Sequence, residues 1–221
     1  MTRDGAVVLR ILWVGLFAVA FAFVESSVVV YLQALYYPEG FSFPLKLISQ
    51  KHLAVELVRE AATILILAAL GWIAGWSGWQ RFGYFLVAFG IWDLFYYVWL
   101  KVILDWPLSL TDWDVLFLIP VPWIGPVIAP ISIALLMTVC GGLIVIRISK
   151  GRYFRPALLS WLLGLIATVL LLYSFISDIP AALQEQNPAP YHYELLVTSM
   201  LLYVAGFATA CKAPALNPPI T

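Results

Sequence analysis

The sequence predicts an all-α fold, a polytopic transmembrane helix bundle of about six spans with both termini on the cytoplasmic side (N-in/C-in). Of its 221 residues, 63% are hydrophobic and 11% are charged, whereas a soluble domain covers its surface with roughly 25% charged residues. Six stretches are apolar over the roughly 20 residues that a helix needs to cross a bilayer. Basic residues concentrate in alternate connecting segments, and this bias orients the spans.

The six spans are expected to be helices, because a bilayer offers no water to the backbone and a barrel would show short alternating segments instead. They form one transmembrane domain over residues 1–212, and a tail with three prolines at 213–221 is expected to be disordered. In chain order the spans are Val7–Leu32, Leu53–Ala74, Phe82–Leu104, Ile124–Ile146, Ala157–Ile176 and Glu194–Cys211.

The first span has a competing interpretation as a signal peptide. Arg3 and Arg10 precede an apolar run that contains Ala18-Val19-Ala20, which fits a cleavage site. The apolar character resumes after Glu25 and continues through Val28–Leu32. That length favours a full span, and cleavage would leave five spans without inverting the others.

The second span is expected to extend beyond the bilayer on its outer side. Pro44 suits the first position of a helix, where its missing N–H is not needed. A helix from about Pro44 to Ala74 would be roughly 46 Å long at 1.5 Å per residue. Its first turns would therefore protrude from the membrane.

The connector before the fourth span, Asp105–Pro130, cannot be one regular helix because it holds four closely spaced prolines after residue 119. Its segment Val115–Ile119 is nevertheless apolar enough to dip into the bilayer. Two interpretations stay open: an interfacial loop with tryptophans at the membrane surface, which is favoured, or a partly re-entrant segment that covers a site.

The segments on the two sides of the membrane differ in their number of basic residues. With the N-terminus inside, inner segments hold eight basic residues and outer segments three, and both termini are placed in the cytoplasm. The inner ones are Arg3, Arg10, Arg81, Arg147, Lys150, Arg152, Arg155 and Lys212, and the outer ones are Lys46, Lys51 and Lys101. A cytoplasmic (inner) membrane location follows.

Five acidic residues lie inside predicted spans, where a charge costs about 2.5–3.5 kcal/mol or more and usually faces the bundle interior. Glu194, at the start of the last span, is expected to be exposed, and the depths of the other four allow them to share one site. Asp93 is at the middle of the third span, and Glu25 is roughly 9 Å outward of the centre of the first. Glu60 and Glu56 are roughly 5 and 11 Å outward of the centre of the second. These depths form a series from the outer interface to the midplane.

Helical periodicity supports a common site. His52, Glu56, Arg59 and Glu60 occupy one sector of about 100° on the second helix. On the third helix, Gly90, Asp93 and Tyr97 form a similar stripe, and Gly90 would allow a neighbour to approach closely. The expected cluster for a ligand or for proton handling is Glu25, Glu56, Arg59, Glu60, Asp93 and Tyr97.

The charge of this cluster requires compensation, because four carboxylates face one guanidinium. Either some carboxyl groups are protonated or a bound cation balances them. His52, Glu56 and Glu60 offer nitrogen and oxygen donors for a divalent metal. A haem is not expected, because His52 and His192 are the only histidines and neither lies deep in a span.

Asp112 and Asp114 are expected either to cap the following helix or lie in water, or to form the outer mouth of the cluster. The basic loop Arg147–Arg155 is expected to meet anionic lipids of the inner leaflet. No basic run indicates nucleic acid. A membrane-protein partner or a homo-oligomer stays open.

Three functions remain open on the residues alone. The first is an outward-facing site that binds a cation, a metal or a small ligand, as in a transporter. The second is a membrane-embedded enzyme that acts on a lipid or isoprenoid with carboxylate acid–base chemistry. The third is a scaffold or accessory subunit of a membrane complex, in which Arg59 and its partners only fix helix packing.

Overall fold

A computed structural model of the chain describes residues 3–43, 45–46, 48–178 and 188–212. The expected disordered tail at 213–221 lies outside these residues. The described chain forms six α-helices and one two-stranded sheet. In order, these elements are α1 (Arg3–Tyr36), α2 (Gln50–Ala74), α3 (Gly78–Leu104), β1 (Trp113–Phe117), β2 (Trp123–Pro126), α4 (Ile128–Ser149), α5 (Leu158–Ile176) and α7 (Tyr193–Lys212).

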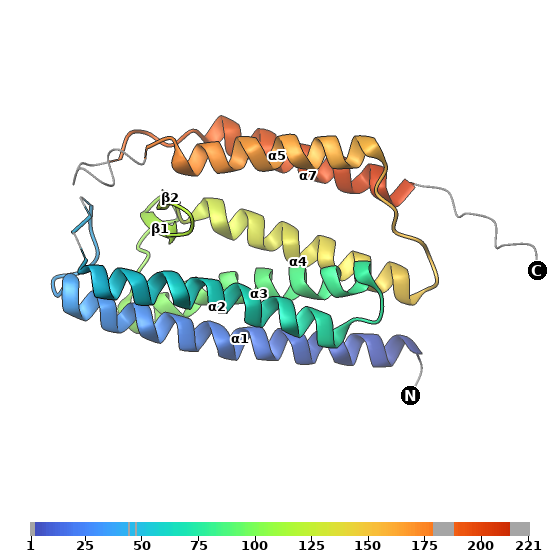
Figure 1. Cartoon of the computed structure of the whole chain (residues 1–221), viewed down its shortest axis with the longest axis horizontal. Coiled ribbons are helices and arrows are strands. Elements are labelled where there is room, and N and C mark those ends of the chain that lie inside the picture. The colour runs from blue at the N-terminus through green and yellow to red at the C-terminus, as the bar shows by residue number, and fades with distance from the viewer. Residues whose placement is uncertain (1–2, 44, 47, 179–187, 213–221) are drawn as a thin grey trace, which may run out of the picture.

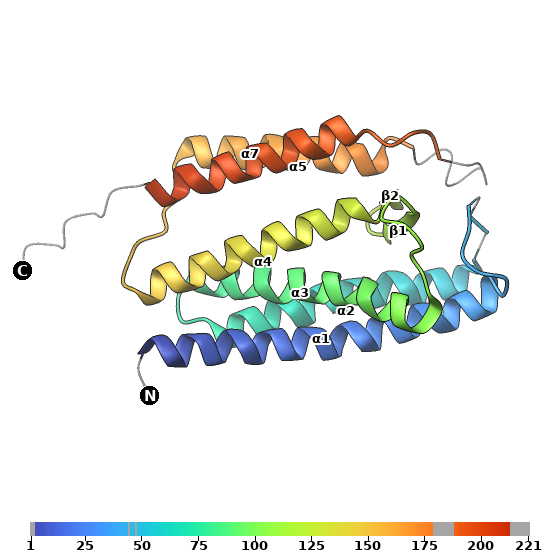
Figure 2. The same ribbon diagram turned by 180° about the vertical axis from the view of Figure 1, so that it is seen from behind.

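The helices run side by side along the long axis of the molecule (Figures 1 and 2). Helices α1 to α4 form one group, and α5 and α7 form a pair on the far side of α4. The start of α1 and the end of α7 lie at the same end of the bundle, while the β1–β2 hairpin lies at the opposite end.

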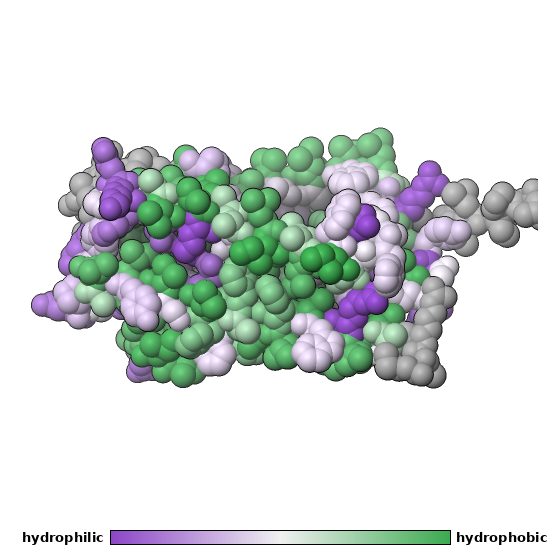
Figure 3. All heavy atoms as spheres, turned by 60° about the horizontal axis from the view of Figure 1, so that its bottom comes forward, coloured by the Kyte–Doolittle hydropathy of each residue, from purple (hydrophilic) through white to green (hydrophobic). Residues whose placement is uncertain are grey.

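Five of the described helices are long and apolar enough to cross a membrane, namely α1, α3, α4, α5 and α7. This confirms the expected class of helical membrane protein, although α2 is not among the five and the count of six is not confirmed. The N-terminal half of α2 carries Lys51, His52, Glu56, Arg59 and Glu60. Apolar residues cover most of the middle of the face in Figure 3, and hydrophilic ones gather towards its ends.

The predicted start of the second helix was wrong. Helix α2 begins at Gln50, and the hydroxyl of Ser49 caps it by accepting a hydrogen bond from the His52 N–H at 3.2 Å. Such a cap satisfies one of the free N–H groups at a helix start. Residues 45, 46 and 48 precede it without helical structure, and Pro44 lies outside the described residues.

The predicted start of the fourth helix, Ile124, was also wrong, because Trp123–Pro126 is the second strand of a hairpin. The strands pair antiparallel, with Asp114 opposite Gly125 and an irregularity between Val115 and Phe117. Helix α4 begins only at Ile128. The connector is thus an ordered hairpin between α3 and α4.

Helices α3 and α4 pack at backbone contact through glycines. A Cβ on Gly90 would lie 2.3 Å from the Thr138 hydroxyl oxygen and 2.4 Å from the Ala134 carbonyl oxygen. A Cβ on Gly141 would lie 2.5 Å from the Gly83 carbonyl oxygen. Small residues permit such approach between membrane helices, and the expected role of Gly90 is confirmed. This contact holds the Asp93 segment of α3 against α4.

Candidate functional site

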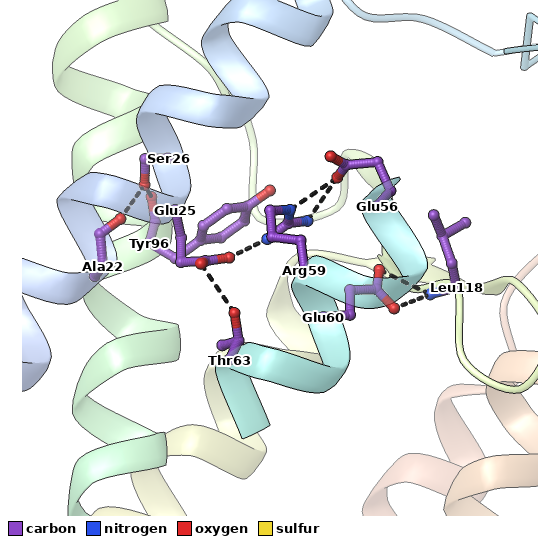
Figure 4. Close-up of polar contacts among 9 residues, drawn as sticks. All are labelled: Ala22, Glu25, Ser26, Glu56, Arg59, Glu60, Thr63, Tyr96 and Leu118. Atoms are coloured by element: carbon purple, nitrogen blue, oxygen red, sulfur yellow. Dashed lines mark hydrogen bonds and ion pairs between the residues drawn. The ribbon is translucent and has the colours of Figure 1, made fainter. Parts of the chain in front are cut away.

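Arg59 of α2 links this helix to α1 (Figure 4). Its Nε donates to Oε2 of Glu56 at 2.9 Å, and Nη1 pairs with Glu25 of α1. The Thr63 hydroxyl donates to the other Glu25 oxygen at 2.9 Å. Both carboxylates are buried, so this network satisfies charges that would otherwise be costly in the bilayer.

Glu60 is directed differently from its neighbours on α2. Figure 4 shows its carboxylate turned away from Arg59 and towards Leu118, the residue that follows β1. The Leu118 N–H donates to both carboxylate oxygens, at 3.0 and 2.9 Å. A buried acid on α2 therefore holds the hairpin over the bundle.

Asp114 of β1 is buried and contacts α3. It accepts a hydrogen bond from the Tyr97 hydroxyl at 2.9 Å and another from the Val115 N–H at 2.8 Å. Burial raises the pKa of the Asp114 carboxyl to about 7, although these two bonds oppose the shift. Near neutral pH this acid therefore exists in both protonation states.

One cavity of about 540 Å³ joins these groups. Its wall takes residues from α1 to α5, from the segment before α2 and from the hairpin. All six residues of the expected cluster line it, namely Glu25, Glu56, Arg59, Glu60, Asp93 and Tyr97, and Asp114 lines it as well. Its volume is within the range of about 300–1,000 Å³ that is typical of small-ligand sites.

Two polar groups in this wall lack a hydrogen-bond partner within the described residues. No described donor reaches the carboxyl group of Asp93, although Asp114 interacts with it electrostatically. The indole N–H of Trp92, a residue only 6% exposed, has no acceptor there either. Buried polar groups are normally paired. The Trp92 nitrogen is enclosed by protein, but the Asp93 carboxyl lines the cavity without a partner and is available to a ligand.

The charge of the cavity wall is unbalanced. Five carboxyl groups line it, whereas the described basic residues in the wall are Arg59 and Lys46. Arg59 is already engaged by Glu25 and Glu56, and the Lys46 ammonium lies 5.2 Å from the Tyr37 ring centroid. The rest of the wall is mainly aliphatic and aromatic.

The residues expected to bind a metal do not converge. The His52 Nδ1 pairs with the Tyr36 hydroxyl at 2.6 Å, and His52 is not among the lining residues. Glu56 and Glu60 are engaged by Arg59 and by the hairpin. Within the described ranges, no group of three His, Cys, Asp or Glu side chains is placed to hold a metal ion. The metal prediction gains no support here.

The structure separates the two acids expected at the outer mouth. Asp114 lines the cavity, but Asp112 is not in its wall and accepts hydrogen bonds from the Leu108 and Ser109 N–H groups at 2.7 and 3.1 Å. Asp112 thus stabilises its own turn. His192 pairs with Glu194 at 2.8 Å, and both side chains are exposed.

Sequence reasoning missed Thr63 and Trp92, and it named Asp114 as a candidate for the outer mouth of the cluster. Thr63 follows Arg59 by four residues, so the helical period already puts it on the polar face. Trp92 gave no signal, because tryptophan is common throughout this sequence. The depth of Asp114 could not be predicted, because the depth of a strand residue cannot be counted from a helix centre.

Comparison of the chain with protein-family models, with curated proteins and with solved structures found no match. The geometry of the cavity is therefore the basis for assigning a function.

Proposed function

We propose that the chain is a multi-pass protein of the cytoplasmic (inner) membrane, with one transmembrane domain over residues 1–212. In this proposal α2 is the sixth span, and the bundle end that holds Arg10 and Arg147 faces the cytoplasm. The bias of basic residues supports this orientation. On the inner half of α2, Leu65 and Ile73 are 69% and 79% exposed, which suits contact with lipid. The Arg147–Arg155 loop then meets anionic headgroups.

We further propose that the cavity binds a small ligand that carries a positive charge. The observation that carries this proposal is the unpartnered Asp93 carboxyl in a wall where acids outnumber bases. An ionised carboxylate removed from water needs a compensating charge, and a ligand cation would supply it. The aromatic rings around Asp93 add a favourable surface for a cation.

Two other functions fit the geometry less fully. A scaffold role accounts for Arg59, Glu25 and Thr63, which fasten α1 to α2, but it leaves Asp93 unused. A membrane-embedded enzyme acting on a lipid or isoprenoid is the second candidate, because the free Asp93 carboxyl is suited to act as an acid or base. Turnover that Asp93→Asn abolishes would identify it.

Binding of butylammonium to the purified protein tests the proposal. Trp92, Trp106 and Trp123 line the cavity, so intrinsic fluorescence reports occupancy. We expect saturable binding by wild type and none of neutral butanol. Asp93→Asn should bind about tenfold to hundredfold more weakly, because a hydrogen bond to a charged group contributes about 1.5–3 kcal/mol.

Asp105→Asn is the matched control. Asp105 follows the same helix, its side chain is 82% exposed and it pairs with Lys101, so this variant should bind like wild type. Equal binding by the Asp93→Asn protein, or an equal response to butanol, would remove the basis for a cation site.

A further inference from the structure

Part of the cavity wall is apolar, and we call this part the apolar arm. It takes residues from three helices: Phe85 and Phe89 from α3, Ile133 and Met137 from α4, and Leu171 and Leu172 from α5. Phe85 precedes Asp93 by eight residues, so on α3 the apolar wall reaches about 12 Å along the helix from Asp93 towards the end where α3 begins. The carboxyl groups belong to the outer part, and this arm has none.

Helices α5 and α7 pack on the rest of the bundle at two places, and the arm begins at the first of them, because Leu171 and Ile133 belong to that contact. At the outer end, Phe175 of α5 and Tyr191 join a cluster with Ala129 and Trp123. At the inner end, Ala210 of α7 joins a cluster with Ile144 and Phe154. Met137 and Leu172 line the cavity and are only partly buried.

We infer that the ligand is a single-chain amphiphile with a cationic head group, whose apolar chain enters from the bilayer between α4 and α5. This inference rests on the proposed cation site, which receives the head group at Asp93. The chain lies in the arm formed by Phe85, Phe89, Ile133, Met137, Leu171 and Leu172. One chain fits better than two, because 540 Å³ is the volume of a drug-sized site.

The head group, and not the chain, distinguishes this ligand from bulk lipid. An alkyl chain that moves from the lipid tails into the apolar arm gains little free energy, since both surroundings are equally apolar. The ammonium gains carboxylates and aromatic rings that the lipid tails lack. The alkyl chain of the ligand instead supplies access, because it concentrates the ligand in the bilayer beside the arm.

Binding of dodecylammonium and of butylammonium to the protein in phosphatidylcholine nanodiscs tests the inference. Empty nanodiscs measure how much of each probe partitions into the lipid alone. The test variant Met137→Trp fills the arm. We expect it to weaken dodecylammonium binding at least tenfold more than butylammonium binding. The control Val139→Trp places the same ring on the 57% exposed face of α4 and should weaken neither.

A photoreactive probe gives a second measurement on the unmodified protein. A twelve-carbon ammonium with a diazirine at the chain end should label residues of the arm, and excess dodecylammonium should prevent the labelling. Labelling confined to exposed residues, or equal effects of Met137→Trp on both probes, would overturn the amphiphile while leaving the cation site intact. Butylammonium binding that does not depend on Asp93 would overturn both.

Discussion

The Tyr97 hydroxyl donates a hydrogen bond of 2.9 Å to Oδ2 of Asp114, and both residues are buried. Tyr97 belongs to α3 and Asp114 to β1, so this bond is one of the ties between the hairpin and the helices. Together with the bond from Leu118 to Glu60, it fixes the hairpin over the cavity from two sides.

Tyr97→Phe should lower the free energy of unfolding by about 1–3 kcal/mol, because it removes one partner of a buried polar pair. Thermal unfolding followed by near-ultraviolet circular dichroism is the measurement. Tyr31→Phe is the control, since Tyr31 is 69% exposed and should change stability by no more than about 0.5 kcal/mol. Equal effects of the two variants would contradict a role for the bond.

Stability should fall as the pH rises from about 4 to 7, through Asp114. Its pKa is raised from 3.8 to about 7 in the folded protein, so in this window the folded state holds a proton that the unfolded state has released. The stabilisation that the Asp114 proton supplies is complete below about pH 4, is lost as the pH rises and is gone above about 7. Chemical unfolding at each pH measures it, and Asp114→Asn should have a flatter profile. An unchanged profile would contradict the assignment.

Arg59→Met should lower the free energy of unfolding by about 3–5 kcal/mol, because Glu25 and Glu56 would remain buried without a cation. The double variant Arg59→Met with Glu25→Gln should recover part of the loss. Lys101→Met breaks the exposed pair with Asp105 and should cost no more than about 1 kcal/mol. If Arg59→Met were as mild as Lys101→Met, the network would have no structural role.

Gly90→Ala should separate α3 from α4 and lower stability by about 1–3 kcal/mol, as overpacking does. The added methyl would lie within 2.4 Å of the Thr138 hydroxyl and the Ala134 carbonyl. Gly142→Ala is the matched control on α4, where no atom lies within 4 Å of an added Cβ. Thermal unfolding of both variants checks this, and a tolerated Gly90→Ala would show that the interface is looser than described.

The helical part of the fold could be predicted from the sequence because each apolar run has to satisfy its backbone internally. Five of the six expected runs correspond to helices that can cross a membrane. The hairpin could not be predicted in this way. Its strands have five and four residues, and their register depends on pairing across a proline-rich turn rather than on a local period.

The acids of the cavity could be placed together because depth and angle along a helix follow from the rise and twist per residue. That argument predicted that Glu25, Glu60 and Asp93 share one site at graded depths, and the structure lines one cavity with them. Counting residues along a helix does not show which hydrogen-bond partners each side chain finds. The Tyr36 hydroxyl engages His52, and a backbone N–H engages Glu60, and neither is visible in the spacing.

Helix α1 starts and helix α7 ends at the same end of the bundle, and this arrangement has a practical consequence. A charged maleimide that cannot cross the bilayer would reach cysteines substituted at Arg3 and at Lys212 from one compartment only. In sealed vesicles of defined sidedness both positions should therefore be labelled together or protected together. Labelling of just one of them would mean that the chain crosses the membrane an odd number of times.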